Sequence, residues 1–122
     1  MDIDQIIKNS SYLFYCKECY LLKIKPADIQ NRKSTEYQNL VEIAKLYFSN
    51  RLQSKFAGYL MESQYLVQLW TAHLILEYGN PNDELKKACL NEIEKYSTTP
   101  LDIELAKQEM LWLENYNGNV TY

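Results

Sequence analysis

The chain is poor in the residues from which most active sites are built. It has three glycines, three prolines and a single histidine among 122 residues. Glycine-rich phosphate loops, serine–histidine triads and the H-E-x-x-H helix of zinc proteases are all absent. No stretch approaches the roughly 20 unbroken apolar residues of a membrane-spanning helix. These absences predict a protein that is not an enzyme and does not associate with a membrane.

Length and composition predict one folded domain. A chain of 122 residues, 47% hydrophobic and 24% charged, can bury a core without disulfides or metal ions. The acidic start, Met1-Asp2-Ile3-Asp4, does not lead into the basic and apolar regions of a secretory signal. We therefore expect a cytoplasmic protein, and its three cysteines suit a reducing compartment.

Large amphipathic side chains are abundant, with eleven tyrosines. They are spread along the whole chain and cannot form one patch, so most of them suit the boundary of a core. A few near the carboxyl third could add rigid anchor area to an interface: Tyr78, Tyr96, Tyr116 and Tyr122.

The hydrophobic pattern is helical almost throughout, because apolar residues return every three or four positions and no alternating strand pattern is present. The sequence predicts an all-α fold of about five to six helices. A compact helical bundle and a short array of antiparallel helical hairpins both fit. We expect a single helical domain over residues 1–116 and a C-terminal tail over 117–122, where Asn and Gly replace the helical pattern.

The first two thirds of the chain offer three helical regions. Residues 2–24 suit one long helix, or two helices broken near Asn9-Ser10-Ser11. A second helix should follow the polar loop at 28–34, with these residues on its buried side: Tyr37, Leu40, Val41, Ala44, Tyr47 and Phe48. The third region, 52–78, is one long helix or two joined near Gly58 or Ser63.

Two junctions between predicted helices carry clear helix-capping signals. Gly79 stands where a left-handed C-terminal cap is needed, and Asn80-Pro81 offers an N-cap and a first-turn proline. The same order recurs at Thr99-Pro100. These signals predict helices over 64–78, 81–96 and 100–116, with neighbours antiparallel because the loops are short.

Charge is distributed unevenly along the chain. Residues 1–76 carry nine Lys/Arg and seven Asp/Glu, and residues 77–122 carry four Lys/Arg and nine Asp/Glu. The balances are therefore +2 and −5. An acidic carboxyl third repels phosphate backbones and attracts basic surfaces, so we expect a basic protein partner and no nucleic acid.

The last helix has two neighbouring stripes at helical spacing. One is apolar: Ile103, Ala106, Met110 and Leu113. The other mixes acids with large side chains: Asp102, Leu105, Glu109, Trp112 and Tyr116. If the first stripe is buried, the second faces outward and offers carboxylates beside aromatic anchors, a composition that protein interfaces favour. The alternative is that Trp112 and Tyr116 close the edge of the core.

Cysteine and histidine offer a second function class. Cys16-Lys-Glu-Cys19, Cys89 and His73 make four potential zinc ligands, and a CxxC pair can also exchange disulfides. The pair lies inside a helical segment with no preceding strand and no second ligand pair, so we expect buried thiols, no metal site and no cofactor. His73, one turn from Glu77, is expected to be a buried or half-buried structural histidine.

The carboxyl half of the chain resembles a known class of protein. Residues 69–77, LWTAHLILE, followed by the Gly79-Asn80-Pro81 turn and the next helix, look like HEAT-type helical hairpins. Together with the small acidic helical character, they resemble the small all-α immunity proteins that neutralise bacterial toxins, over residues 64–116 at most. The resemblance implies one-to-one binding of a basic toxin domain, often a nuclease, by blocking its active cleft.

We therefore expect a protein-binding inhibitor of the immunity type that docks an acidic and aromatic surface on a basic toxin domain. One alternative is a helical adaptor or self-associating scaffold, with a homodimer formed through the same stripe. Another is a metal-binding or redox protein that uses Cys16 and Cys19. The residues expected to bind the partner are Asp83, Glu84, Glu94, Asp102, Glu109, Trp112 and Tyr116.

Overall fold

The computed structural model describes the backbone of residues 2–120 and the side chains of residues 2–117. Over that range the fold is all-α, as predicted, with no strands. Its seven α-helices and three 3₁₀-helices are α1 (Ile3–Lys8), α2 (Ser11–Leu21), η1 (Ile29–Lys33), α3 (Thr35–Ser49), α4 (Gln53–Ala57), η2 (Gly58–Met61), η3 (Gln64–Leu66), α5 (Val67–Tyr78), α6 (Asp83–Ser97) and α7 (Ile103–Val120).

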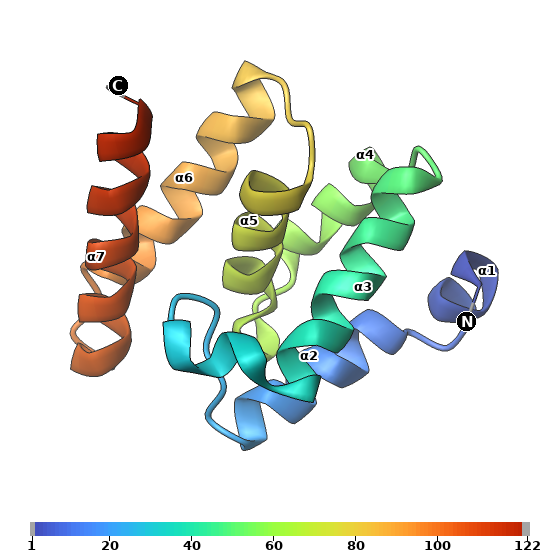
Figure 1. Ribbon diagram of the computed structural model, residues 1–122, viewed down its shortest axis with the longest axis horizontal. Coiled ribbons are helices and arrows are strands. Elements are labelled where there is room, and N and C mark those ends of the chain that lie inside the picture. The colour runs from blue at the N-terminus through green and yellow to red at the C-terminus, as the bar shows by residue number, and fades with distance from the viewer. Residues whose placement is uncertain (1, 121–122) are drawn as a thin grey trace.

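The two-helix alternative for residues 2–24 is confirmed. The break falls at Asn9 and Ser10, where Ser10 adopts a left-handed backbone with φ 52°. A short polar residue tolerates this conformation better than an apolar one, because its side chain can bond locally. The break lets α1 and α2 run in different directions, and α1 lies at one end of the molecule (Figure 1).

The helix predicted after the polar loop is also confirmed. Ser34 caps α3 by accepting a hydrogen bond from Tyr37 N at 3.1 Å. The buried side of α3 carries most of the residues assigned to it from periodicity: Tyr37, Leu40, Val41, Ala44 and Tyr47.

Region 52–78 is divided into four elements, α4, η2, η3 and α5, rather than one or two helices. One break follows Ala57, where α4 tightens into η2, and another follows Met61. Tyr65 and Leu66 then both adopt left-handed backbones, with φ 52° and 59°, before α5 begins at Val67. The predicted helix 64–78 is therefore shorter at its start than the apolar pattern indicated.

Both predicted helix junctions are present, but the residues and backbone conformations that cap the helices differ from the prediction. The backbone at Gly79 is extended, with φ −93° and ψ −169°, so the predicted left-handed cap is wrong. Asn82 rather than Asn80 caps α6, accepting from Leu85 N at 2.8 Å. Asp102 rather than Thr99 lies before the first turn of α7, accepting from Leu105 N at 3.1 Å. Because these side chains supply the caps, α6 begins two residues after Pro81, and α7 begins three residues after Pro100.

The end of the last helix was also predicted too early. We expected a tail from residue 117, because Asn117 and Gly118 carry turn chemistry. The helical backbone of α7 instead continues to Val120. Residues 121 and 122, with the candidate Tyr122, lie outside the described range.

The arrangement places α7 at an edge. Figure 1 shows α3 and α5 near the middle, α1 at one end and α7 at the opposite end, with α6 running antiparallel to α7 beside it. The middle is filled by an aromatic cluster in which Tyr12 packs on Phe56 and Tyr59 at ring-centroid distances of 4.7 Å. Tyr12 is fully buried, and its hydroxyl bonds Thr71 Oγ1 at 2.9 Å. α5 lies against this cluster and buries eight of its twelve residues.

Gly79 is required by a close approach rather than by its backbone angle. A Cβ there would lie 2.6 Å from Gln53 Oε1 and 2.8 Å from the carbonyl oxygen of Ile75. Gln53 cannot withdraw freely, because its amide bonds both backbone groups of Asn80, at 2.7 and 3.2 Å. Gly79→Ala should therefore lower the free energy of unfolding by about 1–3 kcal/mol, measured by urea denaturation.

Gly58→Ala is the matched control. Gly58 has helical φ and ψ, and a Cβ there meets nothing within 4 Å. Gly58→Ala should leave the free energy of unfolding unchanged or raise it by up to about 1 kcal/mol. Equal losses at the two positions would contradict the close-approach account.

Candidate functional site

The orientation of α7 is the reverse of the prediction. In the stripe expected to face outward, Leu105 is 3% exposed and Glu109 is fully buried. In the stripe expected to be buried, Ile103 is 67% and Met110 49% exposed. The prediction that Glu109 belongs to an outward binding surface is therefore wrong. In the predicted core stripe, Ile103 and Met110 are exposed, and Ala106 and Leu113 are half-buried.

A buried partner for Glu109 explains this orientation. Glu109 Oε1 accepts a hydrogen bond from His73 Nε2 at 2.5 Å, across the gap between α7 and α5. His73 is itself only 1% exposed. An isolated carboxylate belongs in water, but a carboxylate facing an imidazolium can be buried. His73 therefore fixes which side of α7 faces the core.

The pair extends into a chain of charges. His73 Nδ1 lies 3.7 Å from Glu77 Oε2, one turn along α5. Glu77 also forms a two-point pair with Arg32 of η1, at 2.7 and 3.0 Å. Arg32, Glu77, His73 and Glu109 thus form a chain of alternating basic and acidic groups from η1 through α5 to α7.

The protonation states follow from this order. Burial alone would lower the pKa of His73, but its bond to Glu109 and the charges of Glu109 and Glu77 outweigh burial and raise that pKa above 6.5. Burial opposes the charge of Glu77, yet His73 and Arg32 hold its pKa below the ordinary value. Both shifts favour the charged forms of His73 and Glu77.

Trp112 and Tyr116 shield this network. The Trp112 ring meets His73 edge-on with centroids 4.5 Å apart, and Tyr116 stacks on Trp112 at 5.0 Å and 13°. Both residues are half-buried. Trp112 packs against the core, which was the alternative interpretation of these aromatics, and Tyr116 covers Trp112.

The imidazole has no surface through which it could meet a substrate. Its Nε2 is engaged by Glu109, Trp112 covers its edge, and 1% exposure leaves no route for a ligand. Such a group can hold a charge and fix a geometry. Proton transfer to a bound molecule would require α7 to move away.

The acidic excess of the carboxyl third is partly neutralised inside the fold. Of its nine Asp/Glu, three pair with cations from residues 1–76: Glu77 with Arg32, Glu109 with His73, and Asp102 with Lys25 at 3.2 Å. Glu92 pairs with Lys95 within α6 at 2.9 Å. The +2 and −5 portions of the chain therefore attract one another, and much of the predicted acidic pole joins α7 to the rest of the molecule.

The remaining predicted acids lie on α6 and do not converge. Asp83 and Glu84 are exposed at the start of that helix and Glu94 is exposed near its end. At 1.5 Å per residue the two groups are separated by roughly 15 Å. Asp102, near the second group, is half-buried and committed to Lys25 and to capping α7. The seven predicted residues thus do not form one site.

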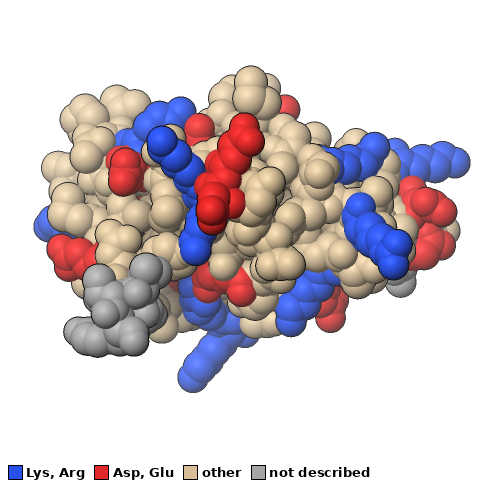
Figure 2. Space-filling model, turned by 90° about the horizontal axis from the view of Figure 1, so that it is seen from above, with Lys and Arg blue, Asp and Glu red and all other residues tan. Residues whose placement is uncertain are grey.

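The surface shows mixed charge. On the face drawn in Figure 2, Lys/Arg and Asp/Glu side chains are interspersed across apolar and neutral residues. No single-sign field covers that face, so long-range steering would be weaker than the sequence balance indicated.

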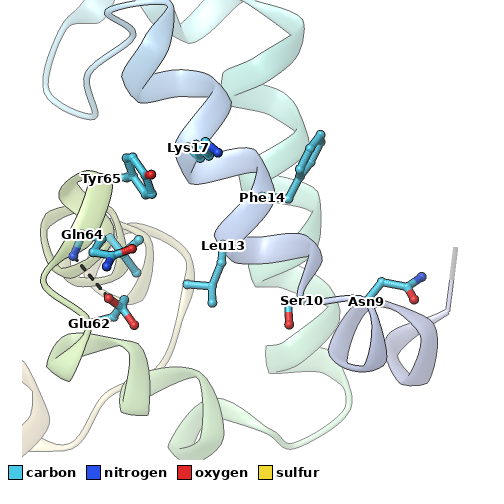
Figure 3. A pocket seen from close by; sticks show the side chains of 9 residues that line it. Asn9, Ser10, Leu13, Phe14, Lys17, Glu62, Gln64 and Tyr65 are labelled. Carbon is cyan, nitrogen blue, oxygen red and sulfur yellow. Dashed lines mark hydrogen bonds between the residues drawn. The ribbon is translucent and has the colours of Figure 1, made fainter.

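Several grooves mark the described surface. One, of about 640 Å³, lies between the end of α2 and the α6–α7 connection, and the Lys25–Asp102 pair lines it. Another, of about 540 Å³, lies between η1 and α7. A third, of about 270 Å³, lies beside α2, where Leu13 points toward the loop carrying Glu62 and Gln64 (Figure 3). None of these three includes His73 or a cysteine in its lining.

The cysteines are packed as apolar residues. All three are fully buried, and Cys16 and Cys19 lie on the inner side of α2. Burial raises the pKa of Cys19 and of Cys89 to about 12 and also raises that of Cys16. Among residues 2–117, no group of three or more His, Cys, Asp or Glu side chains is arranged to hold a metal ion.

Comparison of the chain with protein-family models, with curated proteins and with solved structures finds no match. Within the described residues, none of the helices has the length and hydropathy needed to span a bilayer. Sequence reasoning identified His73 and Glu77 as a pair but missed Glu109 and Arg32 as their partners, since no local pattern joins positions 36 and 45 residues apart.

The His73–Glu109 pair makes stability depend on pH. A histidine whose pKa is raised by folding stabilises the fold fully below its unfolded pKa of about 6.5 and loses that contribution as pH rises through the folded pKa. Glu109→Gln should lower the free energy of unfolding by about 2 kcal/mol near pH 6 and by less near pH 9. Urea denaturation at both pH values measures the difference.

Glu104→Gln is the control, because Glu104 is an exposed acid on the same helix. It should have little effect at either pH. A loss for Glu109→Gln that is the same at both pH values would show that His73 carries no charge in the folded state.

Thiol labelling tests the packing of the cysteines. A fully buried thiol with a raised pKa presents almost no thiolate, so the folded protein should react with iodoacetamide far more slowly than the urea-unfolded chain. Mass spectrometry should find no labelled cysteine before unfolding and all three labelled after it. Rapid labelling of Cys16 or Cys19 in the folded protein would favour the metal or redox alternative.

Proposed function

We propose that this chain is a non-catalytic, protein-binding inhibitor of the immunity type, which docks the outward side of α7 on a basic partner domain. We define the α7 outer face by its exposed residues: Ile103, Glu104, Lys107, Met110, Leu111 and Glu114. This face replaces the stripe predicted from sequence. The last helix remains the docking element, but with its other side presented.

The observation that carries the proposal is the exposed apolar area on this face. Ile103 is 67%, Met110 49% and Leu111 55% exposed, and the six residues fall within about one third of the helix circumference. Large apolar side chains clustered on one side of an edge helix are typical of interaction surfaces. Methionine in particular adapts its shape to a partner.

Charge favours a basic partner. The face carries two carboxylates, Glu104 and Glu114, and one cation, Lys107. The exposed acids Asp83, Glu84 and Glu94 on the neighbouring helix add to the negative side. Acids around an apolar centre speed the approach of a basic domain, while the apolar residues supply most of the affinity.

The buried network supports this role indirectly. An inhibitor gains affinity when its binding surface is rigid before contact, because less freedom is lost on binding. His73, Glu109 and Trp112 hold α7 against the body of the protein, so the outer face is presented in one orientation. In this proposal the chemistry-bearing residues position a surface and do not react.

A capture experiment tests the proposal. Immobilised wild-type chain is incubated with lysate of its own organism at low and high salt, beside the variant Glu104→Lys/Leu111→Ser. We expect one basic protein, recovered in a one-to-one ratio by the wild type, weakened by salt and lost with the variant.

The matched control is Phe14→Ser/Glu42→Lys, which also removes one exposed apolar side chain and reverses one exposed acid, on α2 and α3. It should retain the partner. Loss of the partner with the control alone would move the binding surface to the other end of the molecule.

A further inference from the structure

The α7 outer face has a symmetry that the proposed function does not require. Lys107 lies as far before the midpoint between Met110 and Leu111 as Glu114 lies after it. A separation of seven residues is almost two helical turns, so both charged side chains project along nearly the same line of the helix. Neither is in an ion pair with another described residue.

We propose that this face pairs with the same face of a second copy of the chain, through two antiparallel α7 helices related by a two-fold axis at that midpoint. Such an axis makes an interface self-complementary, since each contact occurs twice. In this register Lys107 of each copy faces Glu114 of the other, about 5 Å along the helix from the axis on either side. Opposite charges meet at both positions.

The apolar residues occupy the centre of the same pairing. Met110 and Leu111 lie on either side of the line that joins the two charges, so each lies against its own counterpart in the second copy. Their exposures of 49% and 55% show that this area is uncovered in the single chain. The two ion pairs would then border a central apolar contact, the usual layout of an interface core and rim.

The edge position of α7 makes this pairing sterically open. Figure 1 shows α7 at one end of the molecule with α6 beside it, and the residues of the outer face are exposed. One helix pair buries less than the roughly 1,200 Å² of a standard interface, so the dimer should be weak and concentration-dependent. The self-pairing rests on the proposed function only because both use the α7 outer face. A second copy and a basic partner would therefore compete for that face.

A charge-reversal experiment with the purified chain tests the register without any toxin. Sedimentation velocity is measured from about 10 µM to about 1 mM, a range suited to weak association. The wild type should shift from monomer to dimer. Lys107→Glu alone and Glu114→Lys alone should each lower the association constant about tenfold or more, because like charges then face each other twice.

Mixing the two variants is the decisive arm. In a mixed dimer one copy carries acids at both charged positions and the other carries lysines at both, so opposite charges again meet at each end of the interface. An equimolar mixture of Lys107→Glu and Glu114→Lys should therefore dimerise about as well as the wild type, although each variant alone does not. Lys55→Glu and Glu42→Lys, at exposed positions on α4 and α3, are the controls and should dimerise normally.

The outcomes separate the two proposals. A wild type that stays monomeric throughout the range overturns the self-pairing, and the capture of a basic partner can still succeed. A dimer that is insensitive to both reversals uses another surface and also overturns it. Circular dichroism of each variant confirms that the helices remain folded, so a loss of dimer cannot be attributed to unfolding.

Discussion

The buried contact between His73 and Glu109 is the constraint on which the proposed binding surface depends. It joins α5 to α7 at 2.5 Å and is sealed by the edge of Trp112. α7 also packs along α6, and Leu105 and Trp112 pack against the core as Glu109 reaches His73. With Glu109 turned inward, Ile103, Met110 and Leu111 are turned outward. The exposure of the proposed binding surface thus goes together with a buried histidine–carboxylate pair in the interior.

The pair contributes more to geometry than to stability. Removing a carboxylate and an imidazolium from water costs several kcal/mol, and their mutual attraction roughly offsets that cost. The specific gain is that the alternative rotation of α7 would leave His73 buried without Glu109 and would expose Leu105 and Trp112. Of the two neighbouring stripes on this helix, the one that carries the acids supplies the buried Leu105 and Glu109, so hydrophobic periodicity alone does not predict which stripe faces the core. Lys25–Asp102 and Arg32–Glu77 are more exposed pairs, and they also tie the acidic carboxyl third to the cations of the first two thirds.

Sequence patterns correctly predicted those features that residues close together in the chain determine. The all-α class, the break at Asn9 and Ser10, the buried side of α3 and the packing of the cysteines followed from periodicity, short polar residues and the lack of ligand pairs. Helix starts were misplaced by two or three residues at α6 and α7, because side-chain caps compete with prolines and only the structure shows which wins. The orientation of α7 was wrong because a glutamate in a sequence is counted as surface. Its burial depends on a histidine 36 residues away, which no periodicity reveals.

The titration of His73 tests the central claim most directly. It is the only histidine in the chain, so its imidazole gives one unambiguous set of NMR signals. If the buried pair orients α7, the titration midpoint lies above 6.5 in the wild type and falls in Glu109→Gln, because the charge that holds the proton is gone. A midpoint at or below 6.5 that is the same in both proteins would contradict the account, since His73 would then be neutral or solvated and Glu109 would not be its partner.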